Sequence, residues 1–256
     1  METRRLLLLG AEVDIITPAN VIAFVARKVA AGERAIVANH NLHSLYLFQK
    51  RADMRAFYDL ADLIEIDSMP MIAWARLLGH SVSKEHRCTY LDFRESFWSE
   101  AQAKGWRVYH LGGEEKHNQA SRLAIQARYP NVHIDVHTGF FDMKGPENDA
   151  LLADLEAKKP DVLLVGMGMP RQETWILANR ARLPKCVILP VGAAFDYEAG
   201  AIFTPPRWTG RLGLEWLVRF IFEPRRLFER YFIEPWLLIP QAVGDLVRSR
   251  RAPADA

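Results

Sequence analysis

Short apolar runs alternate with longer amphipathic stretches along the first 200 residues of the 256-residue chain. Short apolar runs bounded by glycine or polar residues are typical of buried strands, whereas apolar positions three or four apart predict helices. The predicted strands cover residues 6–9, 35–38, 64–66, 106–111, 132–136, 161–165 and 186–191. The predicted helices cover residues 18–31, 42–50, 55–63, 71–78, 91–104, 114–127, 147–158 and 170–182. This alternation favours an α/β fold, with a mostly parallel, Rossmann-like sheet covered by helices on both faces.

The pattern changes near residue 200, where the chain becomes rich in arginine, tryptophan and phenylalanine and strand signals end. Helices are predicted at 211–222, 225–231 and 236–250, the last two following the pairs Glu223-Pro224 and Glu234-Pro235. We therefore predict an α/β domain over residues 1–200 and a helical, basic and aromatic appendage over residues 201–256.

Composition narrows the class of protein. The formal net charge of +2 gives no indication of a nucleic-acid partner, and none is predicted. Cys88 and Cys186 lie far apart in apolar contexts, which predicts buried thiols in a reducing compartment rather than a disulfide or a metal site. No run of about eighteen apolar residues is present, so a cytoplasmic chain is predicted unless it lies on a membrane surface.

Polar and glycine residues follow several predicted strands, and the most informative segment is GMGMPRQE over residues 166–173. A buried strand that opens into glycines and a proline-started helix directs backbone N–H groups at a phosphate or nucleotide, although many strand-to-helix turns favour these residues. Asn39, Asp67, Gly112-Gly113 and residues 192–196 also follow strands. Because parallel strands end at one edge of a sheet, these residues are predicted to share a ligand site.

Several segments resemble the WecG/TagA/CpsF glycosyltransferases, glycosyltransferase family 26. They are residues 61–67, 87–92, 108–113, 139–141, 166–173 and 191–196, followed by the stretch from 206 to 226. The resemblance implies an inverting hexosyltransferase that moves a sugar from a UDP-sugar to a polyprenyl-diphosphate-linked saccharide in bacterial cell-surface or exopolysaccharide synthesis. It also implies a peripheral location on the cytoplasmic face of the inner membrane, with no metal or other cofactor.

Inverting transfer needs a base that deprotonates the attacking hydroxyl. Asp67 matches the position of the family's proposed base, and its alternative role is to cap the helix at residue 71. Asn39 is predicted to orient donor or acceptor, or else to close an Asx turn. Arg87 matches a position suited to the leaving diphosphate, or else is a surface charge. Val37 stands where many relatives carry threonine, so any role of that hydroxyl is missing here.

The departing nucleoside diphosphate must be stabilised, and helix N-terminal amides after the glycine turns are suited to this task. Gln172 is a candidate for reading the base or ribose and Asp196 for binding ribose hydroxyls, although each could instead satisfy loop backbone. His40 and His43 are secondary candidates for contacts with sugar or phosphate. The full set of predicted nucleotide-sugar contacts is Gly112, Gly113, Phe140, Gly166, Gly168, Gln172, Gly192 and Asp196.

Two interpretations of acidic and basic residues stay open. Glu65 and Asp67 share one face of a strand and form a reduced Asp-x-Asp pattern, whose alternative interpretation is metal binding. Arginines and tryptophans of the appendage suit an acceptor diphosphate or an anionic membrane surface, although an ordinary packed helix with a solvated basic face has the same composition. The candidates are Arg211, Trp216, Arg219, Arg226 and Arg230.

Two rival functions also remain at the sequence level. The chain could be another nucleotide-dependent α/β enzyme, such as a dehydrogenase, or a non-catalytic nucleotide-binding scaffold of a polysaccharide assembly complex. The sequence leaves the donor sugar, the acceptor sugar and the formation of a homo-oligomer undetermined.

Overall fold

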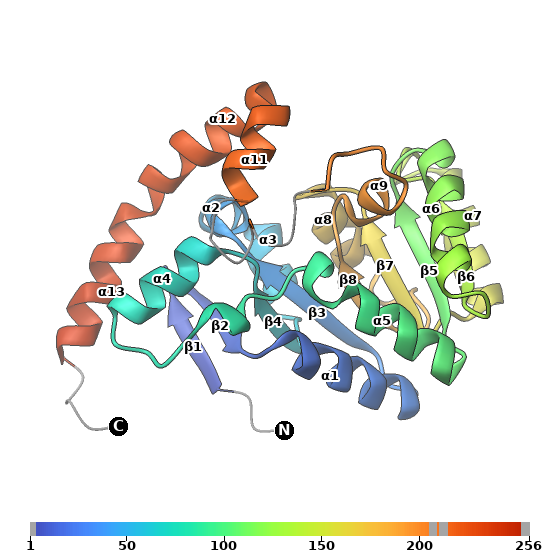
Figure 1. Ribbon diagram of the computed structural model, residues 1–256, viewed down its shortest axis with the longest axis horizontal. Coiled ribbons are helices and arrows are strands. Elements are labelled where there is room, and N and C mark those ends of the chain that lie inside the picture. Colours follow the sequence, from blue (N-terminus) through green and yellow to red (C-terminus); the bar gives the residue numbers. More distant parts are fainter. Residues whose placement is uncertain (1–3, 205–208, 210–214, 252–256) are drawn as a thin grey trace.

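The computed structural model describes residues 4–204, 209 and 215–251 (Figure 1). Its centre is a six-stranded sheet with the order β4-β3-β8-β7-β5-β6, in which every neighbouring pair is parallel. The strands are β3 (Ala35–His40), β4 (Leu63–Ile66), β5 (Arg107–Gly112), β6 (His133–His137), β7 (Val162–Gly166) and β8 (Val187–Pro190). The predicted mostly parallel α/β sheet is confirmed.

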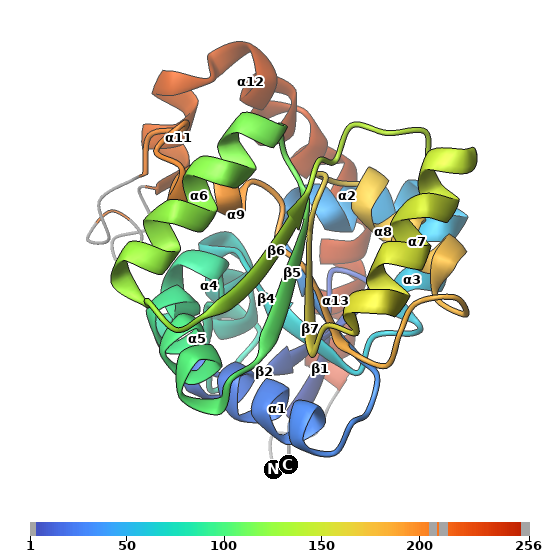
Figure 2. The ribbon, with the colours of Figure 1, turned by 90° about the vertical axis from the view of Figure 1, so that its right-hand side faces the viewer.

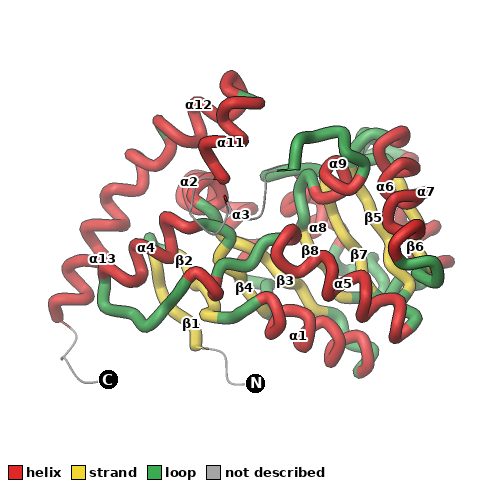
Figure 3. The backbone as a smooth tube through the Cα atoms, viewed as in Figure 1, coloured by secondary structure: helices red, strands yellow, loops and turns green. Residues whose placement is uncertain are grey.

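Helices cover both faces of this sheet (Figures 2 and 3). One face carries α1 (Pro18–Ala30), α5 (Tyr90–Lys104), α6 (Glu115–Arg128) and the short α9 (Ala194–Glu198). The other carries α2 (Leu42–Lys50), α3 (Ala52–Tyr58), α7 (Pro146–Lys158) and α8 (Arg171–Asn179). Helix α1 starts where the sequence predicts, because the Thr17 hydroxyl accepts the N–H of Asn20 at 3.3 Å and Pro18 occupies the first turn.

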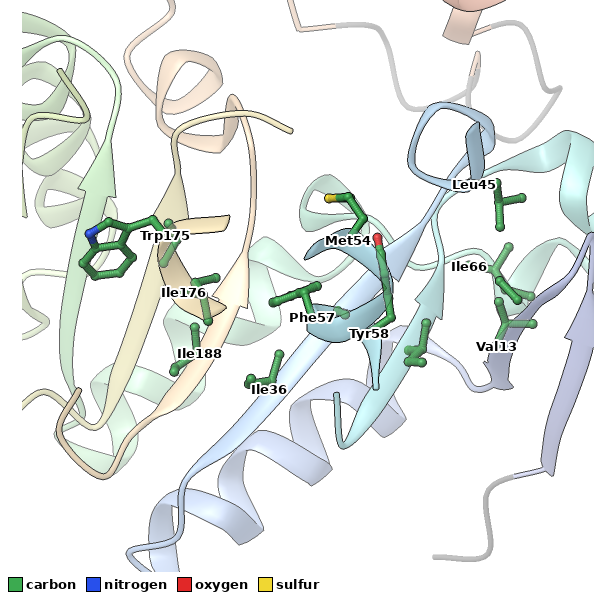
Figure 4. Close-up of a cluster of buried hydrophobic side chains, with 14 of the residues drawn as sticks. Val13, Ile36, Leu45, Met54, Phe57, Tyr58, Ile66, Trp175, Ile176 and Ile188 are labelled. Atoms are coloured by element: carbon green, nitrogen blue, oxygen red, sulfur yellow. The ribbon is translucent and has the colours of Figure 1, made fainter. Parts of the chain in front are cut away.

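The core consists of two apolar clusters, one on each face of the sheet. Side chains alternate along each strand, so Ile36 joins one cluster and Val37 the other. Figure 4 shows the first cluster, in which Phe57 of α3 and Trp175 of α8 pack over strand residues. Strands buried on both faces are nearly continuous in apolar residues, which is why the sequence predicts them well.

A small hairpin lies outside the main sheet. The predicted first strand is β1 (Arg4–Leu8), which pairs antiparallel with β2 (Ala11–Ile15). The sequence does not predict β2, because Glu12 and Asp14 interrupt its apolar pattern. Asp14 is nevertheless buried, where it accepts hydrogen bonds from the Arg5 guanidinium at 2.9 Å and from the Ile64 N–H at 2.8 Å.

The helix predicted over 55–63 is wrong at its end. Helix α3 stops at Tyr58, and Leu63 already belongs to β4. Asp62 fixes this boundary, since its carboxylate accepts the N–H of Ile36 at 2.9 Å and its own N–H donates to the Ile36 carbonyl at 2.9 Å. Helix α4 (Met69–Leu77) then packs beside the hairpin.

The C-terminal part is helical, as predicted. Helices α11 (Glu215–Phe222) and α12 (Pro224–Phe232) lie over the carboxyl ends of the strands (Figure 1), and η2 (Glu234–Leu238) and α13 (Ile239–Arg251) follow. Asp245 of α13 accepts the N–H of Leu9 at 2.7 Å and the indole N–H of Trp74 at 2.9 Å, and Leu238 joins the first core cluster. The boundary between residues 200 and 201 stays a prediction, and the last helix is firmly attached to the sheet domain.

Candidate functional site

A cavity of about 660 Å³ lies at the carboxyl ends of the central strands, beneath α11 and α12. Its position is the one at which parallel α/β sheets bind ligands. Asp67 and the segment 166–172 line this same cavity. The other predicted site residues that line it are Asn39, Arg87, Gly113, Phe140, Gly192, Asp196, Trp216, Arg219 and Arg230.

Asp67 directly follows β4, and its backbone N–H donates to the carbonyl of His40 at 2.8 Å. The Nδ2 of Asn41 lies 3.5 Å from its Oδ2. The N-cap position of α4 is Ser68, whose side chain makes no capping hydrogen bond. Asp67 thus lies at the strand end, in the lining of the cavity.

Asn39 joins two strand ends. Its Nδ2 donates to the carbonyl of Pro190 at 3.0 Å, which ties the end of β3 to the end of β8. The Asx capping role belongs to Asn41 instead, whose Oδ1 accepts the N–H of Ser44 at 3.0 Å at the start of α2. Asn39 is thus held in the cavity wall by a contact that its own local sequence does not reveal.

Arg87 is only 9% exposed and lies in the cavity wall, so the surface-charge interpretation is wrong. Its guanidinium contacts the Asp92 carboxylate at 3.2 Å. The N–H of Cys88 donates to the carbonyl of Ile66 at 2.9 Å, which fastens this segment to the end of β4. The contacts bring a cation beside the strand that carries Asp67.

The glycines at the strand ends divide into two groups. Gly112 pairs with Gly166 in the sheet, and a Cβ atom on Gly112 would lie 2.3 Å from the Gly166 carbonyl oxygen. Gly112 is not part of the cavity lining and has a packing reason to be glycine, while its predicted nucleotide contact stays a prediction. Gly168 and Gly192 have positive φ angles of 75° and 55°, in the region where other residues are strained.

Gln172 holds the two glycine loops in place. Its Oε1 accepts the N–H groups of Gly168 at 3.2 Å and Gly192 at 3.3 Å, while its Nε2 donates to the buried Glu173 carboxyl at 2.8 Å. This arrangement corresponds to the alternative in which Gln172 satisfies loop backbone. Burial raises the pKa of Glu173 to about 7.

The neighbouring loop is held from α8. The Arg171 guanidinium donates to the carbonyls of Gly139 at 3.1 Å and Phe141 at 2.8 Å. Phe140 between them is exposed and lines the cavity, so its ring is available for stacking. The sequence places Arg171 in the first helical turn but does not predict this bracing role.

Asp196, in the first turn of α9, faces the start of α6. Its Oδ1 lies 2.9 Å from Nδ1 of His117, and a Cβ on Gly113 would lie 3.7 Å from the same oxygen. The sequence analysis does not identify His117 as a site residue. Its position, one helical turn after the Gly112-Gly113 pair, is the signal that could have identified it.

The two candidate histidines have different surroundings. His40 is fully buried, stacks on the Tyr58 ring at 3.8 Å and does not line the cavity, so its predicted contact with sugar or phosphate is wrong. Burial lowers the pKa of His40 to about 3, which keeps it neutral. His43 lines the cavity, and its Nδ1 lies 2.6 Å from Oε2 of Glu234 in η2.

The metal interpretation of Glu65 and Asp67 receives no support from the geometry. Glu65 is buried, and burial together with the charge of Asp67 raises its pKa well above the usual value, which favours a neutral acid. Over residues 4–204, 209 and 215–251, no group of three or more His, Cys, Asp or Glu side chains is arranged to hold a metal ion. Both cysteines are free, buried thiols, and burial raises the pKa of Cys186 to about 12.

The roof of the cavity contains basic and aromatic side chains from α11 and α12. Trp216, Arg219 and Arg230 line the cavity, and the Arg219 guanidinium lies 5.5 Å from the ring centre of Tyr197. Arg211 lies outside the described residues, as does the side chain of Arg226.

Many large apolar side chains of the C-terminal helices are exposed. They are Trp216, Leu217, Ile221, Phe222, Phe228, Phe232, Ile233, Trp236, Leu237, Ile239, Val243, Leu246 and Val247. Exposed apolar side chains in such number favour an interaction site. In the described part of the chain, every helix is too short or too polar to cross a membrane.

Comparison with known proteins identifies the family. The sequence model of the Glycosyl transferase WecG/TagA/CpsF family matches residues 6–252. The chain is 30% identical over 142 residues to an N-acetylglucosaminyldiphosphoundecaprenol N-acetyl-beta-D-mannosaminyltransferase from Staphylococcus aureus strain MRSA252, and 29% identical to that from strain NCTC 8325 / PS 47. Each alignment covers 56% of this chain and 55% of the relative, so the chain spans about half the length of the curated relatives it matches. The match over almost all of its sequence shows that the chain belongs to the glycosyl transferase WecG/TagA/CpsF family.

Proposed function

We propose that this protein is a metal-independent inverting glycosyltransferase that moves a sugar from a UDP-sugar to a polyprenyl-diphosphate-linked saccharide. One observation carries the proposal: the carboxylate of Asp67 and the amide-rich segment 166–172 line one cavity beneath basic helices. A base and a diphosphate-binding turn facing the same space are the two parts that inverting transfer requires. Family membership supports the same reaction class.

In the proposed reaction, the Asp67 carboxylate removes the proton from a hydroxyl of the acceptor sugar. The hydroxyl oxygen attacks the anomeric carbon of the donor from the face opposite the nucleotide. A new glycosidic C–O bond forms as the bond to the diphosphate oxygen breaks, and the configuration at carbon is inverted. UDP leaves with the bonding electrons, and the proton stays on Asp67 until solvent removes it.

Negative charge that grows on the leaving diphosphate is stabilised by the groups around it. The Arg87 guanidinium is one candidate, and the backbone N–H groups of these two loops other than those of Gly168 and Gly192, which Gln172 already holds, are the others. Gln172 fixes both loops before the donor binds, so little reorganisation is needed during the reaction. Phe140 offers a face for the uracil ring, and Asp196 offers an acceptor for ribose hydroxyls.

The acceptor enters on the side of α11 and α12 in this proposal. Arg219 and Arg230 face the cavity and are suited to the lipid-linked diphosphate. In this proposal, the protein attaches to an anionic membrane surface at the cytoplasmic face of the inner membrane, and the exposed apolar residues of the C-terminal helices support that attachment. The activity named for the relatives makes UDP-N-acetylmannosamine and N-acetylglucosaminyl-diphosphoundecaprenol the first pair to test.

Replacing Asp67 with Asn tests the proposal. Asparagine keeps the size of the side chain but removes the base, so transfer of labelled sugar to the lipid acceptor should fall about 10²–10⁴-fold. UDP affinity, measured by titration calorimetry, should stay within about twofold. Asp149→Asn, on the exposed surface of α7, is the matched control and should retain both properties.

Three outcomes would redirect the proposal. Undiminished transfer by Asp67→Asn would remove Asp67 from the role of base. Binding of NAD in place of UDP would favour a dehydrogenase-like enzyme. UDP binding without turnover of any lipid acceptor would favour a nucleotide-binding scaffold.

A further inference from the structure

The cavity extends inward from Asp67 into the second core cluster. Part of its lining is at least nine-tenths buried, and we call this part the inner pocket. Around β4 and the start of α5 it contains the apolar and aromatic residues Val37, Cys88, Tyr90, Leu91, Phe93, Leu189 and Ala194 and the polar residues Glu65, Arg87 and Thr89. Glu65 is the single carboxyl group in this set.

Strand register places Glu65 beside the predicted reaction centre. In the parallel pair β3–β4, Asn39 is the partner of Glu65, and Val37 is the partner of Leu63. Because side chains alternate along a strand, Val37 and Asn39 face the side of the sheet that carries α1 and α5, as do Glu65 and Asp67. Glu65 thus lies one step deeper along β4 than Asp67, on the same face.

The Glu65 carboxyl lacks a partner for one of its oxygens. Its Oε1 is buried and accepts or donates no hydrogen bond within the described part of the chain, and the residue is 3% exposed. Burial and the charges of Asp67 and Asp92 raise the pKa of Glu65 well above its usual value, which favours its neutral, protonated form. An unsatisfied buried polar group is costly, and one in a cavity wall indicates a ligand that completes its hydrogen bonds.

We propose that the inner pocket is a subsite for the acetamido group of an N-acetylated sugar, with Glu65 pairing with the amide and Val37, Cys88 and Leu189 receiving the methyl group. This inference rests on the proposed function and names its substrate class. A neutral carboxyl offers an O–H donor next to a carbonyl acceptor, which match the C=O and N–H of an amide. A sugar hydroxyl would leave the apolar part of the pocket unfilled.

The acetamido group can belong to the donor or to the acceptor, and the experiment separates the two. Donor binding is measured with UDP-N-acetylmannosamine and UDP-mannose. Acceptor binding is measured, with UDP present, using short-chain polyprenyl diphosphates that carry N-acetylglucosamine or glucose. The wild-type protein should prefer the N-acetylated member of one pair by about tenfold or more, as expected for a completed buried hydrogen bond.

Two variants of Glu65 provide matched comparisons. Glu65→Gln keeps an N–H donor and a carbonyl in the same volume, so the preference should persist within about threefold. Glu65→Leu removes both groups, and the preference should fall to within about twofold while UDP affinity is unchanged. Glu65→Leu should also unfold at a higher temperature than wild type, because an apolar side chain replaces a carboxyl with an unpaired oxygen. A merely structural Glu65 would not change sugar preference.

Several results would overturn the subsite. They are a wild-type protein without an N-acetyl preference in either pair, or a Glu65→Leu variant that retains it. If Glu65→Leu lowers the unfolding midpoint, Glu65→Met provides the apolar comparison. If UDP fails to bind at all, the proposed donor is wrong, and binding of the acceptor pair measured without UDP then decides the role of Glu65.

Discussion

Glu173 connects a buried carboxyl group to the shape of the loops at Gly168 and Gly192. Its carboxyl accepts the Nε2 of Gln172, which in turn holds the N–H groups of Gly168 and Gly192. Burial raises the pKa of Glu173 from 4.5 to about 7. The folded protein therefore keeps a proton on Glu173 at pH values where the unfolded chain has released it.

This difference predicts a pH-dependent stability. Because the folded-state pKa is raised, the stabilisation is complete below about pH 4.5 and is lost as the pH rises through about 7. The loss relative to Glu173→Gln should be about 3 kcal/mol between these limits, since one pKa unit corresponds to about 1.4 kcal/mol. Urea unfolding of both proteins from pH 4.5 to 8 measures it, with the exposed Glu156→Gln as control. Parallel stability curves for wild type and Glu173→Gln would contradict this account.

Sequence reasoning identifies residues at strand ends more readily than residues that act through others. Asp67 and Asn39 follow apolar strands, so the fold class alone places them in the cavity. The burial of Arg87 and the separation of His40 from the cavity depend on tertiary contacts that local sequence does not encode. Glu65 shows the same limit, because its pattern matches a metal motif while its surroundings favour a neutral acid.

Helices α11 and α12 form the roof of the cavity. They present two arginines to the cavity, Arg219 and Arg230, whereas Arg225 of α12 is exposed and lies outside its lining. Arg219→Gln or Arg230→Gln should weaken binding of the lipid-linked diphosphate about tenfold, since each removes a charge-assisted contact. Affinity for the short-chain acceptor in low salt measures this effect. Arg225→Gln is the matched control, and equal loss in all three variants would indicate general electrostatic attraction instead.

At the level of elements, the sequence predicts the parallel strands and most helices because their apolar periodicity is strong. It misses β2, where the charged Glu12 and Asp14 interrupt the pattern, and α9, which is only five residues long. It also extends α3 into β4, since the turn at Asp62 depends on a long-range contact with Ile36. Short elements fixed by distant partners carry the weakest local signal.

The whole molecule presents an apolar face built from its C-terminal helices. A double variant, Phe228→Ser with Trp236→Ser, removes two large exposed side chains of this face. It should reduce flotation with vesicles containing anionic lipid by about tenfold or more, because each buried aromatic contributes substantially to interfacial binding. Leu123→Ser, an equally exposed apolar position on α6, is the control and should float like wild type. Equal flotation of all three proteins would exclude this face as the attachment site.

Point substitutions suit this test better than removal of the C-terminal segment. Leu238 belongs to the core, and Asp245 accepts hydrogen bonds from Leu9 and Trp74. Cutting the chain near residue 204 would expose that core and leave the Leu9 N–H without its partner. A loss of flotation by such a fragment would report unfolding as much as lost membrane contact.

The attachment of α13 to Leu9 and to α4 also has a mechanical consequence. A membrane-bound helix on a flexible linker would let the sheet domain reorient freely. Here Asp245 instead fixes this helix to the rest of the protein through its hydrogen bonds. Contact with a lipid surface would then fix the tilt of the entire sheet. The opening of the cavity would then keep one orientation relative to the lipid surface, so each arriving substrate would approach it at the same angle.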